Sequence, residues 1–283
     1  MSLADWTTLY RWEWFRRDAW QPTFREQKRG RFGGSCACVA EIAAEFGPGA
    51  RALDASCGFG LKTIVLAEMG VDVVGSDACA FAVEKARELA RREGRAIDYF
   101  VSTWAELPER TPGRFHVIFN DALSWTTTRE EFEASLAGFL RALSPGGVLA
   151  FMGAPEGAPA SPEHQRKILD ELMGRHPRFE IEWTHESGGA RCTALAFRLR
   201  QGFGGQGRER GAEWMDEHHL FLVEEAGRTR LETATIRQPV LWHWPLLAEM
   251  FAAAGFASLH AREFPSRAAD GGPVRLNIAR REA

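Results

Sequence analysis

Short apolar runs and amphipathic stretches alternate regularly between residues 50 and 154. Each apolar run suits one buried strand, and each amphipathic stretch has the period of a helix. The runs predict strands at 51–55, 71–77, 97–102, 115–119 and 148–152, and the stretches predict helices at 61–69, 81–93 and 130–143. Strands that alternate with helices form right-handed βαβ units, so this segment predicts a doubly wound α/β sheet whose strands are mostly parallel.

The pattern changes after residue 154. A connection rich in Gly, Pro and Ala leads to a predicted helix at 163–176. Four runs with a two-residue period then predict a small antiparallel β insert, at 179–183, 192–199, 219–224 and 230–237. A helix at 245–254 precedes strands at 256–262 and 274–279, which we expect to complete the main sheet with an antiparallel C-terminal edge strand.

Aromatic residues dominate the N-terminal segment. Trp6, Leu9 and Tyr10 recur at helical spacing and predict a helical arm. The arm either packs on the core or forms a lid that lines a substrate pocket. We therefore divide the chain into an aromatic arm or lid at 1–34, an α/β core at 35–153, a helix with the antiparallel insert as a substrate cover at 154–244, and a helix with edge strands at 245–283.

Composition narrows the class of protein. The 283 residues include 35 Lys and Arg against 38 Asp and Glu, a formal net charge of −3. This balance argues against binding nucleic acid through its phosphates. No apolar run approaches the roughly 18–20 residues that cross a bilayer. We expect a cytoplasmic protein whose partner is a small molecule, with neither nucleic acid nor membrane bound.

Cysteine and histidine spacing gives no metal signature. The five cysteines are an odd number, and the Cys36-Ala-Cys38 pair has no second pair at a zinc-site spacing, so small buried thiols are the simpler interpretation. His218 and His219 alternate faces on a strand and cannot both enter one pocket. We therefore expect no metal site.

Two glycine-rich segments are candidates for a ligand-binding turn. Leu53 to Gly60 joins a predicted strand to a predicted helix, where small residues let the backbone approach a ligand. Gly202 to Gly207 spells G-x-G-x-x-G, but an alternating strand precedes it and a charged stretch follows. Because the dinucleotide fingerprint requires a strand before it and a helix after it, we interpret the second segment as a hairpin loop.

The first segment carries the candidate chemistry. Asp54 precedes Ser56-x-Gly58-x-Gly60, and Asp77 ends the next predicted strand. An acid in that place can accept both ribose hydroxyls of an adenosine group. This set resembles the class I S-adenosylmethionine-dependent methyltransferase family over residues 50–153. The resemblance implies a Rossmann-like fold and S-adenosyl-L-methionine as cofactor.

The resemblance also implies which residues bind the cofactor: Arg31, Asp54, Ser56, Gly58, Gly60, Asp77, Ala78, Thr103, Trp104 and Asn120. The resemblance implies that the segment with Thr103 and Trp104 lines the adenine, and we expect the flat indole of Trp104 to stack on the base. The Thr-Trp pair, the aromatic arm and the insert are most similar to the glycine N-methyltransferase-type subgroup. There an arginine of the arm, matched by Arg31, holds the cofactor's carboxylate; an exposed helix-end Arg is the alternative.

Two positions depart from that subgroup. His116 stands where members commonly begin strand four with Asp, and residues 151–155 lack the Arg that holds a glycine substrate's carboxylate. Glycine is therefore not the expected acceptor.

Catalytic candidates follow strand four and precede the late helix. Asn120 and Asp121 offer an amide and a carboxylate beside the sulfonium, or else cap a loop. His243 lies between two tryptophans and is either a general base or a helix-capping residue. We expect the substrate pocket to contain Trp20, Trp125 and Trp244.

Together these features predict a methyltransferase that acts on an amine or hydroxyl of a small molecule by in-line transfer. One alternative is a nicotinamide-dependent oxidoreductase, which Asp54 and Thr63, at the third glycine position, both disfavour. The other is a module that binds S-adenosylmethionine without catalysis. The oligomeric state stays open.

Overall fold

A computed structural model describes residues 3–16, 23–111, 114–123, 126, 128–152, 179–201, 214–239, 244–265 and 272–283. The chain divides into two compact units, each made of two stretches of sequence. Residues 1–24 and 159–243 form the smaller unit, and residues 25–158 and 244–283 form the larger one. Residues 1–34, which the sequence groups as one arm, therefore contribute to both units.

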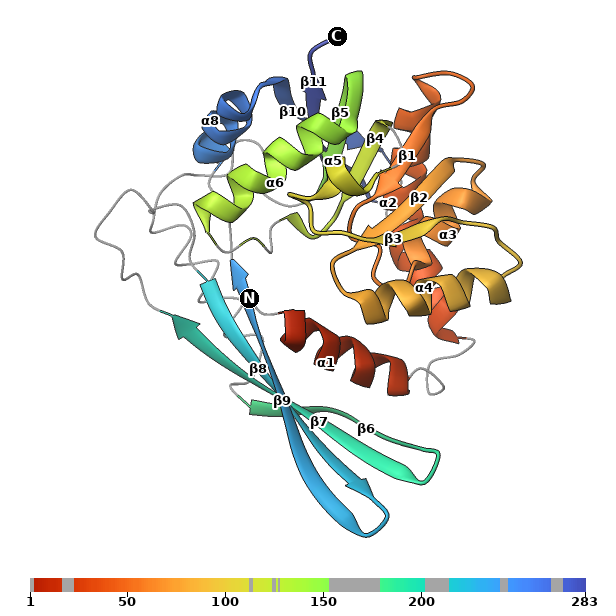
Figure 1. Ribbon diagram of the computed structural model, residues 1–283, viewed down its shortest axis with the longest axis vertical. Helices are drawn as coiled ribbons and strands as arrows, with labels where there is room; N and C mark the ends of the chain where they lie inside the picture. The colour runs from red at the N-terminus through yellow and green to blue at the C-terminus, as the bar shows by residue number, and fades with distance from the viewer. Residues whose placement is uncertain are drawn as a thin grey trace. The chain divides into compact units, whose positions relative to one another are not determined.

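The larger unit is built on a seven-stranded sheet with the order β10-β11-β5-β4-β1-β2-β3 (Figure 1). Its parallel strands are β1 (Arg51–Asp54), β2 (Asp72–Asp77), β3 (Tyr99–Val101), β4 (Phe115–Asn120) and β5 (Leu143–Phe151). β11 (Val274–Arg281) runs antiparallel to both β5 and β10 (Phe256–Phe264). The C-terminal strand is thus antiparallel, as predicted, and β10 lies outside it at the edge.

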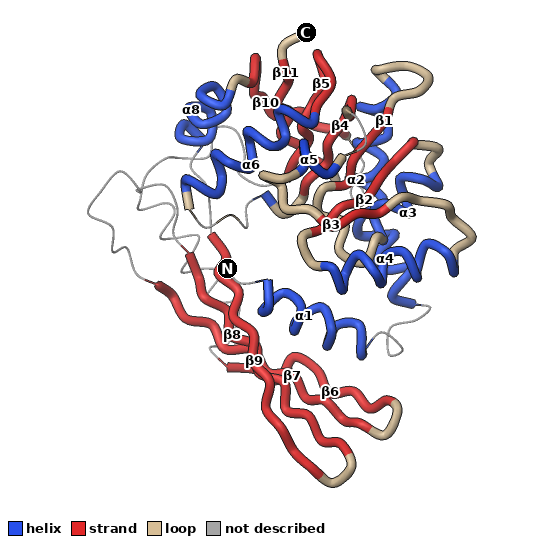
Figure 2. The backbone as a smooth tube through the Cα atoms, viewed as in Figure 1, coloured by secondary structure: helices blue, strands red, loops and turns tan. Residues whose placement is uncertain are grey.

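Helices cover both faces of this sheet (Figure 2). They are α2 (Thr23–Ala44), α3 (Leu61–Glu68), α4 (Ala80–Arg92), α5 (Leu107–Arg110), α6 (Arg129–Ala142) and α8 (Trp244–Ala254). α2 and α3 pack on the face that carries Val148 and Ala150. Phe151 points to the opposite face, where it stacks on Phe251 of α8 at 5.2 Å. No helix in the described part of the chain is long and apolar enough to span a bilayer.

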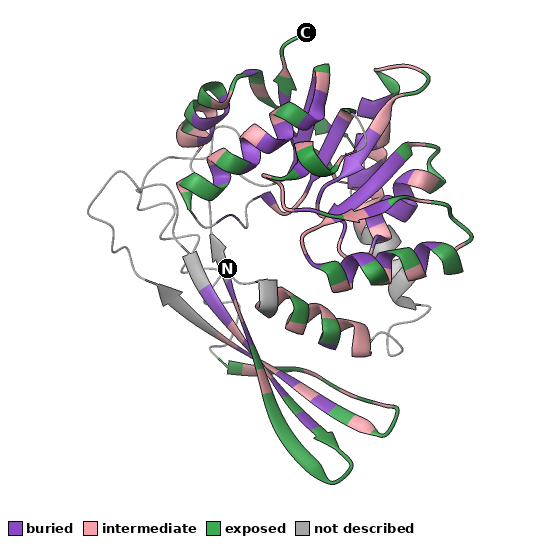
Figure 3. Ribbon diagram, viewed as in Figure 1, coloured by how far each residue is buried: buried purple, intermediate pink, exposed green. Residues whose placement is uncertain are grey.

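The core of the larger unit is the sheet itself, whose parallel strands are largely buried (Figure 3). Cys36 and Cys38 of α2 are completely buried against this sheet as free thiols. This agrees with their interpretation as small buried residues. Burial raises the pKa of Cys36 to about 12, so the thiol stays protonated at neutral pH.

The smaller unit joins α1 (Leu3–Phe15) to a four-stranded antiparallel sheet. Its strands, in sheet order, are β6 (Phe179–Ser187), β7 (Ala190–Gln201), β8 (Trp214–Glu225) and β9 (Arg228–Pro239). Each strand contains one of the four predicted runs and extends beyond it. The predicted helix at 163–176 and loop at 202–207 lie outside the described residues.

α1 packs on one face of this smaller sheet. Small side chains there, Cys192, Ala194 and Ala234, leave room for the indole of Trp12, which is 5% exposed. The indole stacks on Phe221 at 5.9 Å and donates a 2.9 Å hydrogen bond to Glu232. The aromatic spacing of the N-terminal segment therefore reflects a helix with its own apolar partner in the antiparallel sheet.

Candidate functional site

The glycine-rich turn after β1 begins the candidate site. Gly60 ends the turn with φ +78° and directly precedes α3. A Cβ atom at this position would lie 2.6 Å from the hydroxyl of Tyr99, so both the conformation and the packing require glycine. The close packing also brings the turn against Tyr99, the first residue of β3.

Asp77 binds the glycine-rich turn from the end of β2. One carboxylate oxygen accepts a 3.0 Å hydrogen bond from the backbone N–H of Gly58, and the other accepts one of 2.9 Å from Cys79. Ala78 follows in the same turn and is half-buried. Asp77 therefore lies beside the glycines, at the end of the second strand, where the sequence placed it.

Trp104 lies across the same turn. Its indole N–H donates a 2.6 Å hydrogen bond to the carbonyl of Ala55, and its ring packs on Phe139 at 5.9 Å. α6 can approach closely because Gly138 faces the Trp104 carbonyl, where a Cβ would come within 2.0 Å. Thr103 is half-buried beside it, and its carbonyl accepts a 2.8 Å hydrogen bond from Ser102.

Asn120, at the end of β4, has an unsatisfied donor. The side chain is completely buried, and its Oδ1 accepts a 2.8 Å hydrogen bond from the N–H of Ala122. That bond fixes which end of the amide is oxygen. The Nδ2 group has no hydrogen-bond partner among the described residues. A buried donor without a partner is costly, and a bound ligand's oxygen would satisfy it.

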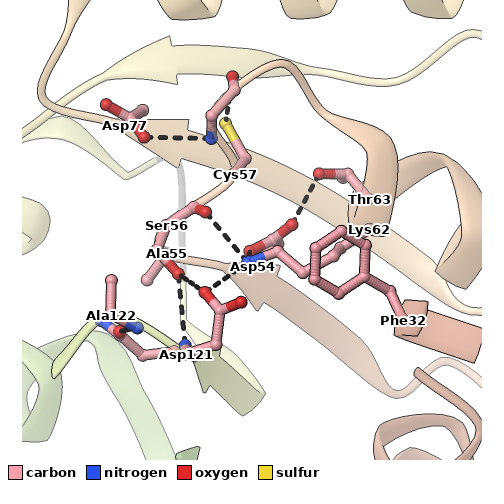
Figure 4. A network of polar contacts seen from close by, with 12 residues as sticks. Phe32, Asp54, Ala55, Ser56, Cys57, Lys62, Thr63, Asp77, Asp121 and Ala122 are labelled. Carbon is pink, nitrogen blue, oxygen red and sulfur yellow. Dashed lines mark hydrogen bonds and ion pairs between the residues drawn. The ribbon is translucent and has the colours of Figure 1, made fainter. Parts of the chain in front are cut away.

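Ser56 and Asp121 connect the turn after β1 to the turn after β4 (Figure 4). The Ser56 hydroxyl donates a 2.8 Å hydrogen bond to Asp121 Oδ1, and the Asp121 N–H returns one of 3.3 Å to the same hydroxyl. β1 and β4 are neighbours where the strand order reverses. Open α/β sheets bind ligands at the carboxyl ends of strands at such a switch point.

Lys62 is the residue of this site that sequence reasoning missed. Its ammonium donates to Asp121 Oδ1 and to the carbonyl of Ser56 at 3.2 Å, and lies 3.9 Å from Asp54 Oδ1. Asp54 is completely buried and accepts a 2.8 Å hydrogen bond from Thr63. The available signal was a lysine inside the apolar start of a predicted helix, Leu61 to Leu66.

The two buried charges shift each other's ionisation. Burial raises the pKa of the Asp54 carboxyl, an effect that the nearby Lys62 ammonium opposes. Burial by itself lowers the pKa of Lys62, but attraction to Asp54 and Asp121 outweighs it and the net shift is upward. Lys62 therefore remains an ammonium throughout the physiological pH range.

The structure brings ten of the sequence-predicted residues to one edge of the larger sheet: Asp54, Ser56, Gly58, Gly60, Asp77, Ala78, Thr103, Trp104, Asn120 and Asp121. Trp20, Trp125 and His243 lie outside the described residues. Arg31 lies in α2, but its side chain is not described, and half-buried Trp244 begins α8.

His116 has a local structural role at the other end of β4. Its Nδ1 accepts a 3.0 Å hydrogen bond from the backbone N–H of Arg51, and its ring lies 5.6 Å from that of Phe46. The imidazole therefore ties the beginnings of two neighbouring strands together. This position is opposite the edge at which Asn120 and Asp121 lie.

A second titratable cluster lies in the smaller sheet. His218 Nδ1 forms a 2.9 Å hydrogen bond with the hydroxyl of Thr235. His219, on the other face of the strand, lies between two carboxylates. His219 Nε2 is 2.9 Å from Glu217, and Nδ1 is 3.5 Å from Glu182. The three side chains are close enough together to be considered for a metal ion. Burial lowers the pKa of the His219 imidazole, but the two carboxylates outweigh burial and raise it to about 9, which favours an imidazolium.

Comparison with known proteins gives a family for part of the chain. A family model described as a methyltransferase domain matches residues 52–147. An S-adenosyl-L-methionine-dependent Diels-Alderase of Talaromyces variabilis is 28% identical over 197 residues, 68% of this chain and 58% of that protein. A ubiquinone biosynthesis O-methyltransferase of Cereibacter sphaeroides is 34% identical over 126 residues, 38% of this chain and 47% of that protein. The chain spans about half the length of the curated relatives that it matches.

Solved structures show the same fold over nearly the whole chain. The sugar N-methyltransferase KedS8 from a Streptoalloteichus species superposes with a TM-score of 0.59 at 18% identity, covering 92% of this chain and 93% of that one. This likeness confirms the predicted doubly wound sheet with its antiparallel C-terminal strand, separate antiparallel sheet and N-terminal helices.

Proposed function

We propose that this chain, which carries a class I S-adenosylmethionine-dependent methyltransferase domain, transfers a methyl group from S-adenosylmethionine to an amine or hydroxyl of a small molecule. The observation that carries the proposal is the meeting of Asp54, Asp77 and the glycine turn at the carboxyl edge of the sheet. Beside them, Ser56 and Asp121 bridge the switch point, where a ligand is expected.

The residues at this edge fit the cofactor's chemistry. Asp77 would accept the ribose hydroxyls, and Thr103 and Trp104 would line the adenine, with Arg31 at the carboxylate. Gly58 and Gly60 allow close approach of the backbone. The orphaned Nδ2 of Asn120 supplies a buried donor that a bound ligand's oxygen would satisfy.

Bound S-adenosylmethionine supplies a methyl carbon already activated by its sulfonium. Transfer would join this methyl to the acceptor and leave the carbon–sulfur electrons on sulfur, so the chain's own residues would need to hold the acceptor in line and take its proton. The protein's task is to align the acceptor and exclude water. We assign alignment to Asn120 and Asp121, and propose His243 as the group that takes the proton.

The acceptor class rests on the relatives and on the resemblance to small-molecule enzymes. The Cereibacter relative is named as an O-methyltransferase of ubiquinone biosynthesis, which supports a small acceptor. The Thr103-Trp104 pair supports the glycine N-methyltransferase-type subgroup. The absence of Arg after β5 in the sequence argues against glycine itself.

Two measurements on the full chain test the proposal. Isothermal titration with S-adenosylmethionine, S-adenosylhomocysteine and NADH should show binding of both sulfur ligands; NADH binding alone would overturn the cofactor assignment. A metabolite screen with isotope-labelled methyl donor should then yield a labelled product. The product readout matters because one relative is named as a Diels-Alderase. Cofactor binding without any labelled product would favour a role other than methyl transfer.

A further inference from the structure

Lys62 is a buried cation at the candidate site that the proposed reaction does not use. Only 6% of the residue is exposed, although lysine usually keeps its ammonium in water. The ammonium lies within 6 Å of two phenyl rings, Phe32 of α2 at 5.8 Å and Phe119 of β4 at 5.6 Å. Two elements outside its own helix, α2 and β4, therefore help to fix its position.

The polar contacts of Lys62 connect the two turns of the switch point (Figure 4). The ammonium reaches the Ser56 carbonyl in the turn after β1 and the Asp121 carboxylate in the turn after β4. Asp121 Oδ1 receives the Ser56 hydroxyl as well. One oxygen of Asp121 is thus held by two donors, one of them charged, and the relative position of the two turns follows from these bonds.

At this edge a single ammonium faces more than one carboxyl group. Asp54 and Asp121 are the carboxyl groups in contact with Lys62, and a single ammonium lies between them. Without that ammonium, Asp121 would present an uncompensated negative charge at the place where we propose that the sulfonium binds. A side chain that changes this charge changes the affinity for a cationic ligand more than for a neutral one.

We infer that Lys62 is a positioning residue that holds Asp121 to the Ser56 turn and sets the charge that the methyl donor's sulfonium meets. This inference rests on the proposed function. S-adenosylmethionine and S-adenosylhomocysteine can test it as a matched pair of ligands. They share one skeleton, but the first carries a positively charged sulfonium and the second a neutral thioether. The ratio of their affinities reports the charge, whereas a common loss of affinity reports the position of the turns.

The test is isothermal titration of the full-length protein at pH 8 with each ligand separately. In K62M we expect both ligands to bind more weakly, with the affinity ratio shifted toward S-adenosylmethionine by roughly tenfold. D121N should shift the ratio by a similar factor toward S-adenosylhomocysteine. K62R keeps the positive charge and should keep a ratio close to that of the wild type.

The matched control is K85M, which removes a lysine paired with Glu88 on α4, outside the site. Its ratio should equal that of the wild type. Equal ratios in K62M and K85M would overturn the inference, since a merely structural role weakens both ligands alike. If K62M does not fold, an unchanged ratio in D121N overturns it instead. A wild-type chain that binds neither ligand overturns the proposed function and this inference together, whereas binding with a ratio that no variant moves overturns the inference alone.

Discussion

Each unit of this molecule holds a cation between two carboxyl groups, and the two sites differ in what surrounds them. Lys62 lies at the carboxyl edge of a parallel sheet, between Asp54 and Asp121. The same edge holds the buried Asn120 amide, whose Nδ2 has no hydrogen-bond partner among the described residues. His219 lies within an antiparallel strand, and its two ring nitrogens face Glu182 and Glu217. The same arrangement of charge lies at the proposed ligand edge in one unit and in the interior of a sheet in the other.

The comparison shows that a buried ion pair does not by itself mark a functional site. Burial lowers the pKa of both Lys62 and His219, and in both cases the neighbouring carboxylates outweigh burial and raise the pKa. What separates them is the backbone: Lys62 contacts the turns that follow β1 and β4, where the sheet ladder ends, whereas ladder hydrogen bonds continue on both sides of His219. The four predictions that follow test this distinction.

The largest effect should come from Lys62→Met. Removing one partner of a buried ion pair leaves the other charges uncompensated, so the free energy of unfolding should fall by about 3–5 kcal/mol. Urea unfolding of the wild type and variant measures it. Lys85→Met, which breaks a more exposed i,i+3 pair, should cost about 0.5 kcal/mol or less. Equal losses in the two variants would mean that the buried ion pair adds no more to the free energy of unfolding than the more exposed pair does.

His219→Gln should destabilise the smaller unit by about 2–3 kcal/mol. The loss is smaller than for Lys62 because Glu182 is partly exposed and water can compensate its charge. The binding of S-adenosylhomocysteine, measured by titration, should not change. A large loss of ligand affinity in this variant would contradict a purely structural role for the cluster.

Asp77→Ala should weaken S-adenosylmethionine binding by about 2 kcal/mol, the value of one hydrogen bond to a charged acceptor. Asp72→Ala, at the exposed start of the same strand, is the matched control and should leave the affinity unchanged. Isothermal titration of both variants makes the comparison. If the two variants bind equally well, the ribose does not lie at Asp77.

The smallest effect concerns pH and His219. Burial lowers the pKa of its imidazole, but the two glutamates outweigh this and raise it from 6.5 to about 9. Because the folded pKa is the higher one, the stabilisation is complete below pH 6.5 and is lost as the pH rises through 9. Thermal unfolding should show a loss of about 1 kcal/mol between pH 7 and 8. His219→Gln should remove this part of the pH dependence.

Much of the candidate site could be predicted because its residues are fixed by local sequence. Asp54, Gly58 and Gly60 follow one strand and Asp77 ends the next, and the ends of parallel strands meet at one edge. The periodicity of the apolar runs was sufficient to place all five parallel strands. These features depend on spacing within a few residues and on the handedness of βαβ units.

What could not be predicted depends on contacts between distant parts of the chain. Lys62 is buried because Phe32 and Asp121 surround it, and neither is near it in sequence. The partner of α1 is likewise more than two hundred residues away, at Phe221. Which of the two last strands lies at the edge also followed from pairing, since both have similar apolar patterns.

The order of the outer strands has a consequence for how the chain is made. β11 lies between β5 and β10, yet it follows both along the chain. While β10 is leaving the ribosome, the outer backbone of β5 therefore has no partner, and the residues of the smaller unit have already emerged. An unpaired strand that carries Phe151 and other apolar side chains is prone to aggregate with other chains. Biosynthesis of this fold should therefore be most vulnerable to aggregation in the interval before residues 274–281 are available.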